Sequence, residues 1–109
     1  MIIGIDLGTT NSLVSVFRDG KAELIPNALG NMMTPSVVHF MDKGEAMIGS
    51  AAKSRLVTSP DQTFARFKRH MGTAKSVRHS RKSFAPEDLS AFVLRNLKAD
   101  AEAFLGEDV

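Results

Sequence analysis

The chain has 109 residues, of which 43% are hydrophobic and 24% charged, with a formal net charge of +2. This length suits one small domain with a single core, and the composition is typical of a folded globular chain. The absence of cysteine excludes a disulfide framework and thiolate zinc sites, and no apolar stretch is long enough to cross a membrane. Because the N-terminus also begins directly on a strand pattern, without a leader pattern, we expect a cytoplasmic protein with no membrane partner.

The first half of the chain predicts mostly β-structure. Aliphatic and β-branched runs of strand length are separated by polar residues, and Asp19-Gly20 is a strong signal for a tight hairpin turn. The expected strands are residues 2–7, 13–18, 21–25, 36–40 and 46–48.

The second half changes to helical spacing. Residues 50–57 predict a short helix, and Ser59 with Pro60 and Gln62 predicts the start of another, which Gly72 would end. In this second helix Phe64, Phe67 and Met71 would share one face. The polar and basic residues 73–84 have weak strand character.

A long helix is expected from Pro86 to Leu105, because a proline and two acids occupy its first turn and Gly106 follows its last. Its apolar stripe comprises Leu89, Phe92, Val93, Leu97, Ala101, Phe104 and Leu105. A helix of about five turns needs a sheet to cover, and in α/β architecture a parallel strand would follow it. We therefore expect residues 1–109 to be the first, incomplete lobe of a larger fold.

The segment "DLGTTN", residues 6–11, carries the clearest chemical signal. If residues 2–7 form a strand, Asp6 lies on the face opposite Ile3 and Ile5. A carboxylate at a strand end suits Mg²⁺, a glycine lets backbone amides approach an anion, and Thr9, Thr10 and Asn11 add polar donors. From the residues alone, a plain polar hairpin turn is the favoured interpretation, because aspartate, glycine, threonine and asparagine are all common in turns.

Positive charge is concentrated in residues 62–86, which contain seven Lys and Arg residues and none of the 12 acidic residues. Such a window favours anions, so a nucleic-acid-binding module is one alternative and a solvated basic face is another. The window lacks the interleaved aromatic residues of a single-strand platform. The cations are Arg66, Lys68, Arg69, Lys75, Arg78, Arg81 and Lys82.

The opening segment "IIGIDLGTTNSLVSV" resembles the first phosphate motif shared by actin, sugar kinases and heat-shock chaperone ATPases. Three later segments resemble, in order, the seventy-kilodalton heat-shock chaperones of the DnaK type: "LIPNALGNMMTPSVVHF", "IGSAAKSRLVTSPDQTFARFKRHMG" and "LSAFVLRNLKADAEAFLG". The short basic connection from Thr73 to Ala85 is similar to that of the HscC branch.

The resemblance implies an α/β fold, the N-terminal part of the actin-like ATPase fold, with a mixed sheet and flanking helices. It implies that Asp6 holds Mg²⁺ through water and that the hairpin residues Gly8, Thr9, Thr10 and Asn11 bind the phosphates of ATP or ADP. It also implies that Lys68, in "FKRHMG", reaches the terminal phosphate and assists hydrolysis.

The implied function of the parent protein is ATP hydrolysis coupled to the binding of unfolded polypeptide clients, with a J-domain co-chaperone as partner. We expect the 109 residues alone to hydrolyse ATP negligibly, and to self-associate through apolar surface left uncovered. One alternative is a sugar kinase of the same superfamily, in which the hairpin would also bind phosphate. The other alternative is a basic nucleic-acid-binding module, in which the hairpin would have no such role.

Overall fold

The computed structural model describes residues 2–41, 45–72, 77–79 and 82–109, with the backbone alone for residues 77–79 and 82. The strands are β1 (Ile2–Leu7), β2 (Asn11–Arg18), β3 (Lys21–Leu24), β4 (Thr34–Pro35), β5 (Val37–Phe40), β6 (Ala46–Ile48), β7 (Thr63–Ala65), β8 (Val77–His79) and β9 (Lys82–Phe84). The helices are α1 (Ser50–Lys53), α2 (Arg55–Thr58) and α3 (Pro86–Leu105), with 3₁₀ turns η1 (Pro60–Gln62) and η2 (Phe67–His70).

The first sheet is built from consecutive antiparallel strands in the order β1-β2-β3, and the short β4 also pairs with β2. Asp19 and Gly20 join β2 to β3 with φ angles of 53° and 74°. Two left-handed residues in succession twist a hairpin turn in the sense that its strands require. The predicted Asp-Gly turn and the strand after it are therefore confirmed.

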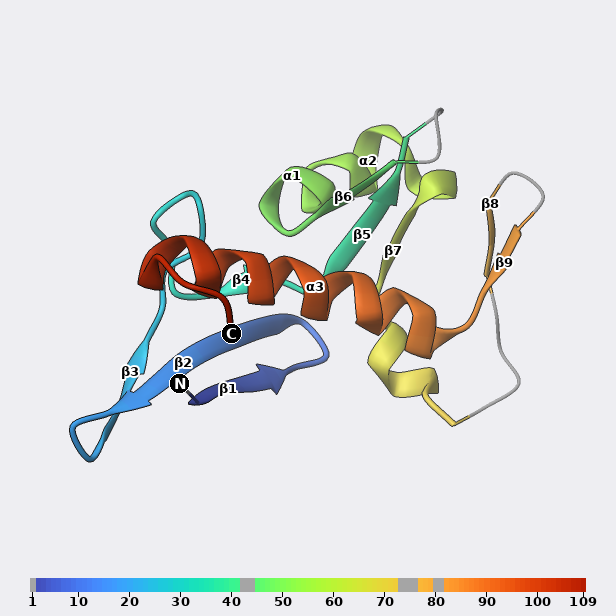
Figure 1. Ribbon diagram of the computed structural model, residues 1–109. Helices are drawn as coiled ribbons and strands as arrows, with labels where there is room; N and C mark the ends of the chain where they lie inside the picture. The colour runs from blue at the N-terminus through green and yellow to red at the C-terminus, as the bar shows by residue number, and fades with distance from the viewer. Residues whose placement is uncertain (1, 42–44, 73–76, 80–81) are drawn as a thin grey trace.

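The second sheet has the order β6-β5-β7, and it is also antiparallel. Helix α1 packs against β5 and β6, while β8 and β9 pair as a separate two-stranded antiparallel sheet (Figure 1). The strand predicted at 46–48 is confirmed, and the helix predicted at 50–57 forms as two short helices with a break at Ser54.

Helix α3 runs between the two sheets and contacts both of them (Figure 1). The backbone N–H of Ala85 donates to the Asp88 carboxylate over 2.8 Å at its start, and Gly106 ends it in the left-handed conformation with φ 73°. The core that it organises with residues of β2, β5 and η2 consists of Val14, Val16, Ile25, Val38, Phe40, Phe67, Leu89, Val93, Leu97 and Ala101. One core thus joins the two sheets.

The predicted stripe of α3 is confirmed at its central positions, because Leu89, Val93, Leu97 and Ala101 are buried. Phe104 departs from it, since its side chain is 46% exposed. Leu105, the next residue, still packs against the core, so Phe104 alone lies at the exposed edge of the stripe at this end. Across the part of the chain that the structure describes, no helix combines the length and the apolar character needed to cross a membrane.

The helix predicted between Ser59 and Gly72 is wrong. This stretch forms η1, strand β7 and η2, and Arg66 between the last two adopts the left-handed conformation with φ 57°. Residues Thr63–Ala65 pair with β5, where the β-branched Thr63 is buried. Pairing with a sheet outweighed the local helix signals, and Met71, expected on an apolar face, is 41% exposed.

Candidate functional site

The turn between β1 and β2 carries the residues predicted to bind phosphate. Ile3 and Leu7 pack against the core, whereas Asp6 is exposed. The predicted division of the first strand is confirmed for Ile3 and Leu7, whereas Ile5, predicted on the same aliphatic face, is 36% exposed. Asp6 pairs with Leu13 across the hairpin, which puts its carboxylate two residues before the turn begins at Gly8.

Gly8 is in a position that admits no side chain. A Cβ placed on it would overlap the backbone carbonyl oxygen of Asn11, which belongs to the first residue of β2. Because the clash is with backbone, neither partner could move aside without changing the turn. The tight approach explains why a glycine follows the strand at this point.

Ser36, which the sequence placed only at the start of a strand, braces this turn from the neighbouring segment. Its backbone N–H donates to the carbonyl of Thr10 over 2.8 Å, and its hydroxyl donates to the carbonyl of Gly8 over 2.8 Å. The Ser36 hydroxyl also lies 2.8 Å from that of Ser12. Since its single proton goes to Gly8, Ser12 must be the donor in this second bond.

These bonds hold the turn at both ends, and both serines are fully buried. Nothing in the local pattern distinguished Ser36 from other strand residues. Its role depends on a contact between residues 28 positions apart in the chain, which only the tertiary structure reveals.

A pocket of about 360 Å³ opens beside the turn. Its lining combines two threonines of the turn with two cations from other elements, and it includes no carboxylate. The lining residues are Thr9, Thr10, Ser36, Val37, Lys53, Leu56, Ala65 and Arg66. Hydroxyl groups and cations without a compensating acid make a surface suited to an anion.

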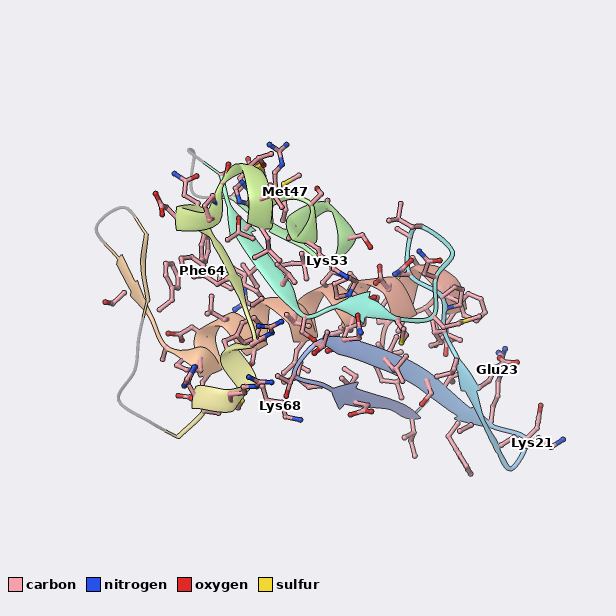
Figure 2. All side chains as sticks on the ribbon, turned by 180° about the vertical axis from the view of Figure 1, so that it is seen from behind. Lys21, Glu23, Met47, Lys53, Phe64 and Lys68 are labelled. Carbon is pink, nitrogen blue, oxygen red and sulfur yellow. The ribbon has the colours of Figure 1, made fainter. Side chains whose placement is uncertain are left out.

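The predicted site residues are brought together only in part. Thr9 and Thr10 line this pocket, but Asp6, Gly8, Asn11 and Lys68 are not among its lining residues. Lys68 is exposed on η2, and in the view of Figure 2 it lies on the other side of the β1–β2 turn from Lys53. The cations that do line the pocket, Lys53 and Arg66, were not predicted as site residues.

Two signals in the sequence could have pointed to Arg66. Arg66 belongs to the basic window, and it stands two residues before Lys68 on a segment expected to approach the phosphates. Lys53 had no such signal, because its proximity to the turn depends on the packing of α1 against β5.

A metal site made by protein side chains alone is not seen in the described ranges, where no three His, Cys, Asp or Glu residues cluster. Of the basic window, Arg66, Lys68 and Arg69 are described as exposed. Lys75 and Arg81 lie outside the described residues, as do the side chains of Arg78 and Lys82.

The model of the Hsp70 protein family matches residues 2–82 of this chain. The match spans most of the sequence, including the β1–β2 turn, α1 and the segment that bears Lys68. The chain therefore belongs to the Hsp70 family. Together with two antiparallel sheets and the helix between them, this confirms the predicted fold class: an α/β structure, the N-terminal part of the actin-like ATPase fold of heat-shock chaperones.

Proposed function

We propose that this chain forms one wall of the nucleotide site of an ATP-dependent chaperone, in which the β1–β2 turn binds the phosphates of ATP or ADP. The observation that carries the proposal is the pocket beside the turn, where threonines and cations meet without an acid. Family membership supports a nucleotide as the source of the phosphates, and it favours a chaperone over the sugar-kinase and nucleic-acid alternatives.

The turn fits a phosphate group in two respects. Gly8 leaves the backbone uncovered where a side chain would block approach, and Ser36 holds the carbonyls of Gly8 and Thr10 on its own side of the turn. With these carbonyls engaged, the amides and hydroxyls of Thr9 and Thr10 remain as donors toward a ligand. Donors held in place before binding cost little reorganisation when an anion arrives.

Asp6 fits an indirect role toward Mg²⁺. The carboxylate is exposed near the turn, and among the described residues it belongs to no group of three or more ligating side chains. Mg²⁺ keeps several of its waters and is often held by one or two carboxylates together with substrate phosphates. We therefore assign Asp6 to contact through water, the metal supplying charge neutralisation between phosphate oxygens when it is bound.

Lys68 is assigned to the terminal phosphate. An exposed ammonium on a flexible stem can follow charge that moves from one phosphate oxygen to another as the phosphoryl group is transferred. In the parent protein, this chemistry would be coupled to binding of unfolded polypeptides, with a J-domain co-chaperone as partner and the cytoplasm as location. The short connection between Thr73 and Ala85 supports assignment to the HscC branch.

The test is a titration of ¹⁵N-labelled protein with a Mg²⁺ complex of a non-hydrolysable ATP analogue, followed by NMR. We expect the amide signals of residues 8–11 to shift, and Lys68→Ala to weaken binding by about tenfold, as the loss of one charged contact to phosphate does. Lys21→Ala is the matched control, since Lys21 is exposed on β3, far from η2 in Figure 2. Unshifted turn amides, or equal losses in the two variants, would refute the assignment.

A hydrolysis assay separately tests the expectation that these 109 residues alone do not form a complete catalytic site. The purified 109-residue chain should release phosphate from ATP no faster than a blank without protein. Robust turnover that Lys68→Ala abolishes would show that these residues already contain a complete catalytic site.

A further inference from the structure

The 3₁₀ turn η2 carries Lys68, and the hydrogen bonds within this turn are long. The backbone N–H of Arg69 donates to the carbonyl of Arg66 over 3.3 Å, and that of Met71 donates to the carbonyl of Lys68 over 3.2 Å. A 3₁₀ turn has poorer hydrogen-bond geometry than an α-helix, which is why such turns stay short. The direction in which η2 presents Lys68 therefore depends on contacts with other elements.

Helix α3 supplies such contacts on both sides of Lys68. The turn η2, yellow in Figure 1, lies against the helix near its start. Just before Lys68, the side chain of Phe67 is buried in the core together with Leu89 of the helix. Beyond the end of η2, the backbone N–H of Gly72 donates to the Glu87 carboxylate over 3.2 Å. Lys68 thus lies between an apolar and a polar point of attachment.

A further contact between the two segments joins Met71 to Ser90. The Ser90 hydroxyl lies 3.5 Å from the methionine sulfur and 2.9 Å from the carbonyl oxygen of Pro86. Because the hydroxyl has one proton and a carbonyl is the stronger acceptor, Ser90 donates to Pro86 and Met71 contributes packing. Of these two contacts, the directional one is the bond from Gly72 to Glu87.

Glu87 can hold Gly72 in place because its own backbone is fixed. It is the second residue of α3, whose start is held by the bond from Ala85 to Asp88 and by the burial of Pro86. Gly72 has a φ of 82°, which glycine adopts without strain, and a Cβ there would meet nothing within 4 Å. A glycine is therefore needed at this point for the direction of the chain and not for space.

We propose that Glu87 is a positioning residue for Lys68. By accepting the hydrogen bond from Gly72, its carboxylate holds the end of η2 against α3 and limits the directions from which the Lys68 ammonium group can reach a phosphate. Glu87 acts through the backbone of η2 and not through contact with the ligand. Because the turn is ordered before binding, less entropy is lost when the ligand arrives. The proposal deepens the proposed function and rests on it for the role of Lys68.

The experiment compares Glu87→Ala with Glu87→Gln in ¹⁵N-labelled protein. Both variants remove a negative charge from the first turn of α3, but glutamine keeps an oxygen that can accept from Gly72. We expect Glu87→Ala to shift the Gly72 amide proton upfield and to increase fast backbone motion from Lys68 to Gly72, measured by ¹⁵N relaxation. Glu87→Gln should restore both signals in part. Glu102→Ala is the matched control, because Glu102 accepts the backbone N–H of Val109 over 3.4 Å at the opposite end of the same helix.

The functional measurement is the affinity for the Mg²⁺ complex of the non-hydrolysable ATP analogue. We expect Glu87→Ala to weaken binding about threefold, in the range of one lost hydrogen bond, and Glu87→Gln to weaken it less. In a Lys68→Ala background, Glu87→Ala should weaken binding no further, because Glu87 acts through that lysine. Glu102→Ala should bind as the unchanged protein does.

The proposal is overturned if Glu87→Ala leaves the Gly72 signal or the affinity unchanged, or if Glu87→Gln restores neither. It is also overturned if Glu87→Ala weakens binding equally with and without the Lys68 side chain, since that result indicates a general loss of structure.

The same measurements keep this proposal apart from the function on which it rests. If Lys68→Ala weakens binding and Glu87→Ala does not, the role of Glu87 fails while the nucleotide site stands. If the protein binds no nucleotide but Glu87→Ala releases η2, the proposed function fails while the attachment of η2 by Glu87 stands.

Discussion

Gly8 and Ser36 show how single residues shape the β1–β2 turn. The glycine lets β2 begin close to the end of β1, and the serine holds the carbonyls on both sides of Thr9. A hydroxyl buried this deeply would be costly without partners, and here the two partners are a carbonyl and Ser12. The turn is therefore rigid before any ligand binds.

Replacement of Gly8 by alanine tests this rigidity. Because the new Cβ would collide with the Asn11 carbonyl, we expect Gly8→Ala to lower the free energy of unfolding by about 1–3 kcal/mol. Gly4→Ala, on β1 just before the turn, is the control, since the nearest atom there is the Ser15 hydroxyl at 3.3 Å, which can rotate away. Chemical denaturation of both variants measures the difference, and equal stabilities would contradict the close approach seen here.

At the scale of elements, α3 determines how the two sheets pack together. Leu97 is 1% exposed in the core between them, whereas Leu94, one turn earlier on the same helix, is 38% exposed. We expect Leu97→Ala to cost about 2–5 kcal/mol of unfolding free energy through lost burial and a new cavity. Leu94→Ala should cost about 1 kcal/mol or less. Unfolding both variants in denaturant measures the two losses of free energy. Equal losses for Leu97→Ala and Leu94→Ala would contradict the packing described here.

Helix α3 also carries Asp100, whose carboxylate is partly buried. Asp100 lines a pocket beside the 27–34 segment, with no cation in its lining, and burial raises the pKa of this carboxyl above its ordinary value. A raised pKa in the folded state means that the native protein binds the proton more tightly than the unfolded chain does. Stability is then greatest below the ordinary pKa and falls as pH rises through the shifted one.

Asp100→Asn removes this penalty and keeps an oxygen that can accept the hydrogen bond from Asn96. We expect the variant to melt at a higher temperature than the unchanged protein near neutral pH, with the difference closing at about pH 3. Melting curves recorded from about pH 3 to neutral pH measure this difference in melting temperature. Asp61→Asn, at an exposed carboxylate on η1, provides the comparison. A gap that stayed constant with pH would rule out titration of Asp100 as the cause.

At the scale of the whole molecule, the outer face of the first sheet carries exposed apolar side chains at the end away from Asp6 and the β1–β2 turn. Ile2 pairs with Phe17 across β1 and β2, and these side chains are 73% and 57% exposed. Leu24 of β3, 45% exposed, continues the same face. Surface of this kind favours association, so the expected self-association of the chain stays a prediction with a defined location.

Sedimentation at increasing protein concentration tests it. We expect the average mass to rise with concentration, and Phe17→Lys to suppress the rise by placing a charge in the apolar face. Val57→Lys is the control, because Val57 is 88% exposed on α2, away from this sheet. A mass equal to that of the monomer at every concentration would contradict the prediction.

Sequence by itself determined the elements whose signals are local. The Asp19-Gly20 turn, the strands on either side of it and the capped helix from Pro86 to Leu105 formed as predicted, because turn geometry and apolar spacing act over a few residues. The opening phosphate motif and the three later segments also indicated the Hsp70 family. The match of the family model over residues 2–82 confirmed this assignment.

Only the tertiary structure decided what happens where local and long-range preferences compete. Residues 59–72 carried helix signals, yet pairing with β5 made Thr63–Ala65 a strand and left Arg66 facing a pocket. In the same way Ser36 and Lys53 reach the β1–β2 turn through contacts across the fold. Free energy gained from burial and sheet pairing between distant segments exceeds the small differences in local propensity, so these positions could not be predicted from neighbouring residues.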